Sequence, residues 1–235
     1  MKIKKILLFS LIPLSIFASN VKISTEYLEG ERLYKQTCVS CHGMHGETNQ
    51  DMQLTVKPRR LKESILSQAQ MVKMISDGGH AWGAHSDIMP AFKYVFEEEQ
   101  IENIALYVTT AFNYERTAKV KKLLLESKPA INDVKKRTRM GKKIFKRNCS
   151  LCHGVTGNGD SVYVEQSKEN QQFLFPYDLT KILLDEDQIF LYAKFGGHFW
   201  GTDKKDMPSW KKKYNDGKLK AVAEYINEKI KKTSK

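Results

Sequence analysis

Two pentapeptides in the 235-residue chain carry residue types that can attach a cofactor covalently. Their Cys-x-x-Cys-His spacing is the signature of c-type haem attachment. Two cysteines three residues apart on one helical turn can reach the two vinyl groups of one macrocycle, and the adjacent histidine can bind the iron. The sequence therefore predicts two covalent haem c groups. The attaching residues are Cys38, Cys41, Cys149 and Cys152, all the cysteines of the chain, and the first iron ligands are His42 and His153.

Two other chemistries of paired cysteines fit this sequence less well. A redox disulfide within Cys-x-x-Cys is expected beside a βαβ pattern, which the sequence lacks. A zinc ribbon needs its second Cys-x-x-Cys about 15–20 residues after the first, whereas the two motifs lie 111 residues apart. We therefore predict haem attachment in preference to disulfide exchange or zinc binding.

The two motifs belong to an internal repeat that covers most of the chain. A Gly-x-x-aliphatic-aromatic segment precedes each motif, and a Gly-Gly-His-x-Trp-Gly segment and a Met-Pro pair follow it. The first copies begin at Gly30, Gly78 and Met89, and the second copies begin 111, 118 and 118 residues later at Gly141, Gly196 and Met207. We predict two domains, at 20–117 and 137–235, joined by a basic linker at 118–136.

Helical periodicity predicts the elements that position these motifs. Near the end of each half, apolar residues recur at i, i+3, i+4 and i+7, the spacing of one helix face. The residues are Ile101, Ile104, Ala105 and Val108, and then Leu219, Val222, Ala223 and Ile226. A middle helix is expected to stop at the glycine pair of each half. No segment has the pattern of a strand, so the predicted fold class is all-α, in two copies.

The combined pattern resembles the class I cytochromes c, and each half resembles one such domain from end to end. The pair resembles the two-domain dihaem cytochromes c of bacterial periplasms, and also the dihaem portion of some haem-copper oxidase subunits. The resemblance implies a helical fold around one haem in each half, in which the first and last helices cross. The crossing residues that it implies are Gly30, Tyr34 and Tyr107, and then Gly141, Phe145 and Tyr225.

The second iron ligand separates an electron carrier from an enzyme. Histidine alone leaves the iron open to small molecules, whereas a methionine closes the position and raises the potential. Among the methionines after the first eighteen residues, only Met89 and Met207 are matched by the repeat. Each is followed by proline, as in the family that the chain resembles. We therefore predict Met89 and Met207 as the second ligands.

One alternative ligand pair stays open. His80 and His198 are also matched by the repeat, nine residues before each methionine, and bis-histidine ligation would lower the potential. The resemblance further implies that the carbonyls of Pro58 and Pro176 accept the second N–H of the iron-binding histidines. The local pattern here is Pro-x-x-Leu, where the family has Pro-x-Leu.

The first eighteen residues have the order of a secretory signal peptide. Lys2, Lys4 and Lys5 precede an apolar run at 6–17, and small residues follow. An uncleaved anchor is the alternative, but twelve helical residues span only about 18 Å of a bilayer core that is about 30 Å thick. We predict an exported protein with a signal peptide at 1–18, located in the periplasm.

The formal net charge of +12 first suggests a nucleic-acid partner. Three of these charges belong to the signal peptide, +10 to residues 119–147, −3 to residues 19–118 and +2 to residues 148–235. Because the chain is expected to be exported and the basic cluster has no interleaved aromatics, nucleic acid is a poor fit. The charges near Met89 sum to −3 and those near Met207 to +3, which predicts two faces for different partners.

These observations predict an electron carrier of a respiratory chain with redox-protein partners and no small-molecule substrate. Haem performs the one-electron chemistry, so no catalytic acid, base or nucleophile is required. A tightly bound subunit of a membrane oxidase or dehydrogenase complex is the alternative. A dihaem peroxidase fits less well, because both halves offer histidine and methionine at matched positions and the chain is short for that class.

Overall fold

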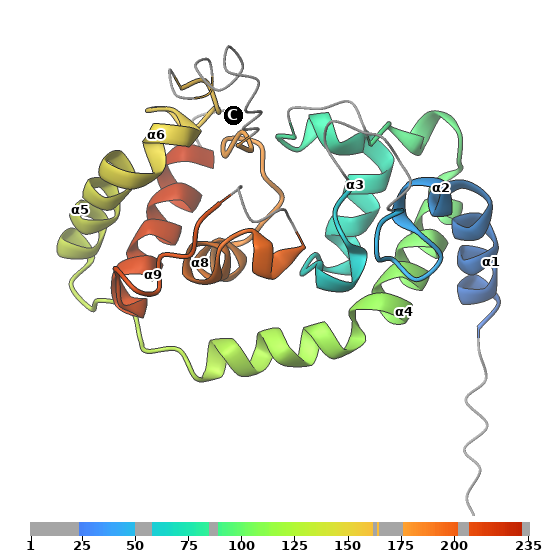
Figure 1. The fold of residues 1–235 in the computed structure, drawn as a ribbon, viewed down its shortest axis with the longest axis horizontal. Coiled ribbons are helices and arrows are strands. Elements are labelled where there is room, and N and C mark those ends of the chain that lie inside the picture. The colour runs from blue at the N-terminus through green and yellow to red at the C-terminus, as the bar shows by residue number, and fades with distance from the viewer. Residues whose placement is uncertain are drawn as a thin grey trace, which may run out of the picture.

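The computed structural model describes residues 24–49, 58–84, 89–161, 164, 176–201 and 207–231, apart from the side chain of Tyr114. The expected signal peptide lies outside the described residues. Every element within these ranges is helical, which confirms the predicted all-α fold class (Figure 1). None of the described helices is long and apolar enough to span a bilayer.

The α-helices follow the same order in both halves, and the short turns between them differ. The first half contains α1 (Thr25–Leu33), η1 (Tyr34–Cys38), α2 (Val39–His42), η2 (Leu61–Glu63), α3 (Gln68–Ala81), η3 (Phe92–Tyr94) and α4 (Glu98–Leu125). The second half contains α5 (Val134–Ile144), η4 (Phe145–Cys149), α6 (Ser150–His153), α8 (Glu186–Phe195), η5 (His198–Trp200), α9 (Asp216–Tyr225) and η6 (Ile226–Ile230). The segments η1, η4 and η6 are π-helical turns, and η2, η3 and η5 are 3₁₀ turns.

The first and last helices of each half cross at a glycine. A Cβ atom on Gly30 would lie 1.9 Å from the carbonyl oxygen of Asn103 in α4, and one on Gly141 would lie 2.0 Å from that of Ala221 in α9. Only glycine permits this approach of two backbones. The rings of Tyr34 and Tyr107 follow at 5.3 Å, and those of Phe145 and Tyr225 at 5.6 Å, between centroids. The crossing implied by the resemblance is confirmed in both halves.

Each half buries its own apolar cluster. Tyr34 and Ile104 are almost fully buried in the first cluster, and Phe145, Phe190 and Trp200 in the second. Burying one such side chain contributes about 1.5–3 kcal/mol. The clusters therefore provide the main stabilisation of the surfaces on which the Cys-x-x-Cys-His turns lie.

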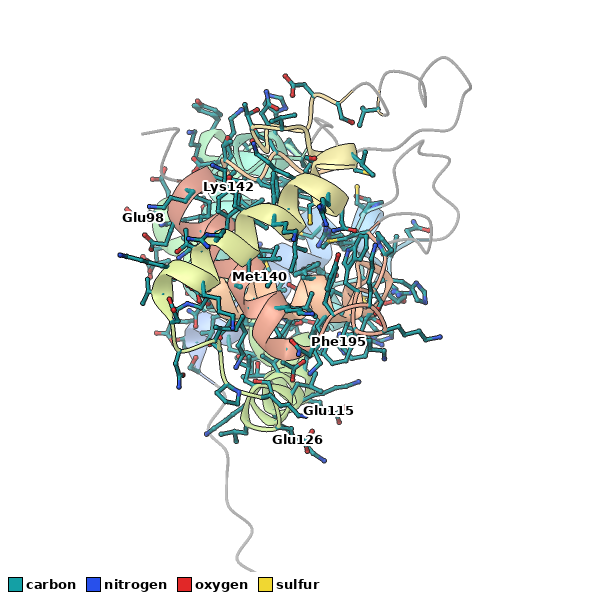
Figure 2. The ribbon with its side chains drawn as sticks, turned by 90° about the vertical axis from the view of Figure 1, so that its left-hand side faces the viewer. Glu98, Glu115, Glu126, Met140, Lys142 and Phe195 are labelled. Atoms are coloured by element: carbon teal, nitrogen blue, oxygen red, sulfur yellow. The ribbon has the colours of Figure 1, made fainter. Side chains whose placement is uncertain are left out.

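Figure 2 views the second half from the side. Met140 of α5 and Phe195 of α8 are partly buried against the second cluster. Glu115 is exposed on α4, which passes below the second half, and Glu126 is exposed directly after the end of α4.

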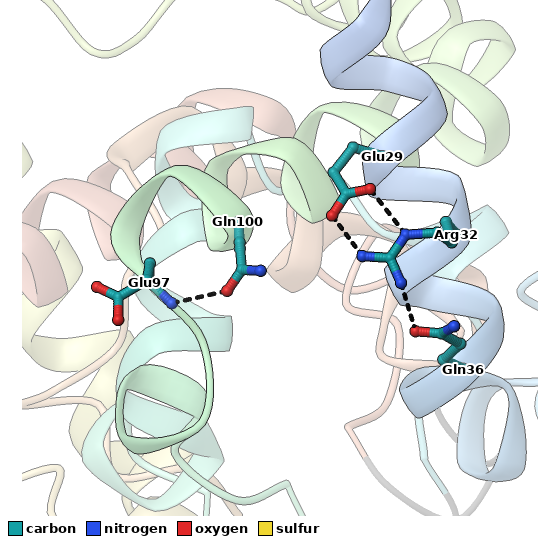
Figure 3. A network of polar contacts seen from close by, with 5 residues as sticks. All are labelled: Glu29, Arg32, Gln36, Glu97 and Gln100. Carbon is teal, nitrogen blue, oxygen red and sulfur yellow. Dashed lines mark hydrogen bonds and ion pairs between the residues drawn. The ribbon is translucent and has the colours of Figure 1, made fainter.

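Surface polar contacts fix the ends of the helices in the first half (Figure 3). The Glu97 N–H donates to Oε1 of Gln100 at 3.0 Å, at the start of α4. In α1, Arg32 donates to both carboxylate oxygens of Glu29 and to Oε1 of Gln36. Such exposed ion pairs contribute little to stability, because water screens the charges. They assist the helices, and the apolar clusters determine how the helices pack.

The long helix α4 joins the two halves. The linker was expected at 118–136. Helix α4 continues through residues 118–125 of this range, and α5 begins at Val134, near its end. Apolar side chains of this stretch pack against the second cluster; they are Val120, Leu123 and Leu124. The guanidinium of Arg116 lies 4.6 Å from the ring centroid of Phe199 and 4.3 Å from that of Trp200. One helix therefore contributes to both cores.

The halves meet through contacts related by an approximate two-fold axis. Nε2 of Gln70 donates to Oε1 of Gln188 at 2.8 Å, and Nε2 of Gln188 donates back to Oε1 of Gln70 at 2.9 Å. Nε2 of Gln70 also donates to the Leu183 carbonyl at 2.9 Å, and that of Gln188 to the Ile65 carbonyl at 2.7 Å. Residues 70 and 188, like residues 65 and 183, are equivalent at the repeat offset of 118. Reciprocal contacts between equivalent positions are the mark of a two-fold interface.

Candidate functional site

Each Cys-x-x-Cys-His motif lies where a π-helical turn runs into a short α-helix. The turn η1 ends at Cys38 and η4 ends at Cys149, and α2 and α6 carry the remaining motif residues. Single π-helical turns within α-helices are frequent at functional sites. The two motifs therefore have the same backbone conformation, although their variable residues differ.

All four cysteine thiols are free and partly buried. Burial, and then the neighbouring Cys41, raises the pKa of Cys38 to about 12. Burial, and then Cys152, raises the pKa of Cys149 to about 12. Cys38 and Cys149 each pack against the apolar cluster of their own half. The thiols of Cys38 and Cys149 are therefore neutral near pH 7 and lie on apolar surface, against which a hydrophobic macrocycle could pack.

The second histidine has the hydrogen bond that a metal ligand needs. Nδ1 of His153 lies 3.0 Å from the carbonyl oxygen of Tyr177. A carbonyl only accepts, so Nδ1 carries the proton and Nε2 keeps its lone pair. Burial lowers the pKa of His153, which favours the neutral imidazole. His153 is therefore neutral, and its Nε2 keeps a lone pair that could bind a metal.

The first histidine has the same environment with looser geometry. Burial lowers the pKa of His42, and the backbone carbonyl of Arg59 opposes this shift. Nδ1 of His42 is buried and has no hydrogen-bond partner of normal geometry. A buried nitrogen without a partner is expected where a bound cofactor would fix the orientation of the imidazole.

The carbonyls implied by the resemblance are displaced by one residue. In the second half Tyr177, and not Pro176, accepts the histidine N–H. In the first half the Pro58 carbonyl accepts the Thr48 hydroxyl at 2.9 Å. The prediction for the prolines is therefore wrong, because the extra residue of the Pro-x-x-Leu pattern presents the next carbonyl to the ring.

The glycine pairs hold the Met-Pro segments in place. The Gly79 N–H donates to the Met89 carbonyl at 2.9 Å, and the Gly197 N–H to the Met207 carbonyl at 2.8 Å. Gly78 has φ 77°, and a Cβ there would lie 2.7 Å from the Met89 oxygen. Met89 and Met207 are partly buried against the same apolar clusters as Cys38 and Cys149. The attachment cysteine and the methionine thus share one cluster in each half.

The competing histidines have a different environment. His80 and His198 are both exposed, at the ends of the segments that carry the glycine pairs. The indole N–H of Trp82 donates to the Lys73 carbonyl at 3.0 Å, and that of Trp200 to its equivalent in the repeat, Leu191, at 3.1 Å. The two tryptophans thus hold the Gly-Gly-His-x-Trp-Gly segments in place by hydrogen bonds to backbone carbonyls of the preceding helices. The environment favours methionine over histidine, although the choice of ligand stays a prediction.

The residues present fit a covalent haem in each half. Each half offers two free thiols, a buried imidazole and a methionine thioether, and the first thiol and the thioether pack on one apolar cluster. Across the described ranges, no three side chains of His, Cys, Asp or Glu converge, so neither motif lies in such a ligand set. A haem ring would supply the remaining iron ligands.

Residues between the halves were missed by the sequence analysis. The guanidinium carbon of Arg59 lies 4.7 Å from the ring centroid of Tyr177, and Nη1 of Arg59 donates to the Tyr192 hydroxyl at 2.5 Å. Aligning the two halves places residues 59 and 177 at the same position of the repeat. Because one is an arginine and the other a tyrosine, the alignment gave no sign that they would contact each other.

Comparisons with known proteins identify the family of the chain. The family described as "Cytochrome C oxidase, cbb3-type, subunit III" matches residues 25–108 and again residues 136–226. A cytochrome c6 of Nostoc sp. is 29% identical over 109 residues, which are 45% of this chain and 91% of that protein. A chain of the reducing HAO-like protein complex of Kuenenia stuttgartiensis has a TM-score of 0.44 and 20% identity, with 84% of this chain and 94% of that chain covered. The chain belongs to the cbb3-type subunit III family of cytochromes c and contains two class I cytochrome c domains in tandem.

Proposed function

We propose that the protein is an exported dihaem electron carrier that passes single electrons between redox proteins of a respiratory chain. The observation that carries the proposal is the matched set of cysteine, histidine and methionine in each half, with the methionine packed on the same cluster as the cysteine. Haem, when bound, supplies reversible one-electron chemistry. Cys38, Cys41, Cys149 and Cys152 would hold it.

The chain's own residues determine what this haem can do. His153, through its bond to the Tyr177 carbonyl, presents one nitrogen in a fixed orientation. The Met-Pro segments are fixed by backbone hydrogen bonds, which supports a closed second position at each iron. A closed position favours electron transfer over the binding of small molecules. An open position in either half would favour an enzyme.

Absorption spectra of the exported protein, reduced and oxidised, with haem quantification, test this proposal. We expect two haems per chain and the weak near-infrared band of sulfur bound to oxidised iron. Met89→Ala and Met207→Ala should each remove part of that band, whereas His80→Ala should leave it intact. A different haem stoichiometry, or a wild-type spectrum without the band, would overturn the ligand assignment.

The two halves differ on the face that follows each methionine. The lysines at 211–213 are exposed, and Lys93, Tyr94 and Val95 occupy the equivalent positions in the first half. Tyr94 is 83% exposed and Val95 is 66% exposed. We propose that the lysine face of the second half binds an acidic redox protein through electrostatic steering.

Charge reversal at 211–213 tests this face. The rate of reduction or oxidation by an acidic redox protein should fall, and its dependence on ionic strength should weaken. The matched control reverses three exposed lysines of α5, at 135, 142 and 143, and should retain more of the rate. If both variants lose the same share of the electron-transfer rate, the effect depends only on net charge, and the proposal that the lysines at 211–213 form the binding face is refuted.

A tightly bound subunit of an oxidase or dehydrogenase complex is the second candidate. The family match and the exposed apolar pair Tyr94 and Val95 favour it. Native purification from the membrane and the soluble fraction separates the two candidates. A free carrier is expected in the soluble fraction, and a subunit is expected to copurify with its complex.

A further inference from the structure

Arg59 touches the iron-ligand environment of both halves. Its backbone carbonyl faces the imidazole of His42, in the first half. Its guanidinium lies over the ring of Tyr177, with 4.7 Å from the guanidinium carbon to the ring centroid. The carbonyl of Tyr177 in turn accepts from Nδ1 of His153, at 3.0 Å. One residue thus lies between the two histidines that would bind iron.

The guanidinium is held from a second side. Nη1 of Arg59 donates to the Tyr192 hydroxyl at 2.5 Å, and the guanidinium carbon lies 5.5 Å from the centroid of the Tyr192 ring. Tyr192 belongs to α8 of the second half and is only 9% exposed. A planar cation between two aromatic rings is a specific contact, which a lysine reproduces only in part.

The place of this contact in the fold makes it a direct link between residues beside the two histidines. Residues 59 and 177 are equivalent in the repeat, so the approximate two-fold axis through the glutamine pair relates one to the other. Each residue carries the carbonyl that faces the histidine of its own half. Their side chains therefore connect the surroundings of the two histidines across the interface.

We propose that Arg59 is a positioning residue that couples the two haem sites. Its side chain, from the first half, fixes Tyr177 and so the orientation and basicity of His153 in the second half. The inference rests on the proposed function, because it requires that both histidines bind haem iron. The proposal goes beyond that function, because it states that a substitution of Arg59 in the first half changes the ligand orientation and the potential of the haem in the second half.

The coupling has an expected size. Changing a partner that hydrogen-bonds a metal-bound histidine typically costs about 10–100-fold in metal affinity or activity. Arg59 acts one contact further out, so we expect a smaller effect, about threefold in the equilibrium constant for reduction of the second haem. For a one-electron couple, where tenfold corresponds to 59 mV, this is a shift of about 30 mV.

The experiment measures both haems separately in the oxidised dihaem protein. Hyperfine-shifted NMR signals report the ligand orientation at each iron, and a spectroelectrochemical titration gives the two potentials. The variants Met89→His and Met207→His, each of which changes one haem, assign the signals. Arg59→Met removes the contact, and Arg59→Lys keeps the charge but loses the planar group.

The controls separate position from charge. Arg60→Gln removes a charge one residue away, from a side chain that pairs with Glu63 at 3.1 Å. Tyr177→Phe keeps the ring, and Tyr177→Leu removes it. If Arg59 acts through Tyr177, the double variant Arg59→Met with Tyr177→Leu should be no worse than the stronger single variant.

Arg59→Met and Arg59→Lys are expected to move the NMR signals of the second haem more than those of the first. Tyr177→Leu should reproduce that pattern, whereas Tyr177→Phe and Arg60→Gln should not. Equal shifts of both haems, matched by Arg60→Gln, would reduce the effect to charge and overturn the inference. So would a change confined to the first haem. A wild-type protein without two histidine-ligated haems would instead refute the proposed function.

Discussion

The glycine pair Gly78 and Gly79, where α3 has a kink, provides a sharp test of how Met89 is held. Gly78→Ala places a methyl group at φ 77° and ψ 170°, a region that is almost restricted to glycine. The new Cβ would lie 2.7 Å from the Met89 carbonyl oxygen and 2.8 Å from the backbone of Pro90 and Ala91. All three neighbours are backbone atoms of the Met-Pro segment, so this segment must move.

The size of the effect follows from two costs. The strained backbone costs about 1–3 kcal/mol, and the forced shift of packed backbone costs about 1–3 kcal/mol more. Together they disfavour the closed segment by about 2–6 kcal/mol, which is a change of about 30-fold to 10⁴-fold at 1.4 kcal/mol per factor of ten. Met89 should therefore leave the iron in a substantial fraction of molecules.

The neighbouring glycine is the matched control. Gly79 has an ordinary backbone conformation, and a Cβ there would lie 3.4 Å from the Cβ atoms of Ala84 and Met89, which is normal contact. Gly79→Ala keeps the N–H that donates to the Met89 carbonyl. It should cost less than about 1 kcal/mol, in the range of ordinary surface and volume-conserving changes.

The assay measures the near-infrared band and the affinity for added imidazole. Gly78→Ala should lose the contribution of the first haem to the band and bind imidazole at that haem, while the second haem stays unchanged. Gly79→Ala should behave as the wild type does. The reasoning is refuted if Gly78→Ala keeps the full band and excludes imidazole, or if both alanine variants are equally impaired.

Three further predictions concern packing and the interface. Gly141→Ala should lower the free energy of unfolding of the second half by about 3 kcal/mol, measured by denaturant titration, because the helices must separate; an unchanged midpoint would contradict this. Gln188→Leu should destabilise the docked halves by about 1–3 kcal/mol in the same titration, because the Ile65 carbonyl loses its side-chain donor and the Gln70 amide loses its partner; adding Gln70→Leu should cost more again, because the Leu183 carbonyl then loses its donor. Trp200→Phe should lower the melting temperature measured by circular dichroism, since the Leu191 carbonyl loses its donor at about 1–3 kcal/mol; an equal melting temperature would argue against that bond.

The haem motifs and the fold class were accessible from sequence because they depend on short-range patterns. The Cys-x-x-Cys-His spacing, the apolar helical periodicity and the repeat are all visible within a few turns of helix. The close helix crossing was also predictable through the resemblance, since glycine at 30 and 141 precedes an aromatic residue at 34 and 145 in both copies. The assignment of Met89 and Met207 stays a prediction.

The contacts between the halves were not accessible in this way. Gln70 and Gln188 look like ordinary residues of a helical first turn, where a glutamine commonly accepts from the capping residue, as both do here. Their second role depends on how two separate surfaces meet. The extension of α4 was hidden for another reason: apolar residues at 120, 123 and 124 lie within a strongly basic stretch, so charge dominated the pattern.

The covalent connection between the halves gives the chain a freedom that two separate copies would lack. In a dimer of identical chains, the residue on the axis would face its own copy, so an arginine would meet an arginine. Here the same position holds Arg59 in one half and Tyr177 in the other, and the two attract each other. Fusion thus permits different side chains at symmetry-related positions, so the surroundings of the two proposed haems need not be alike.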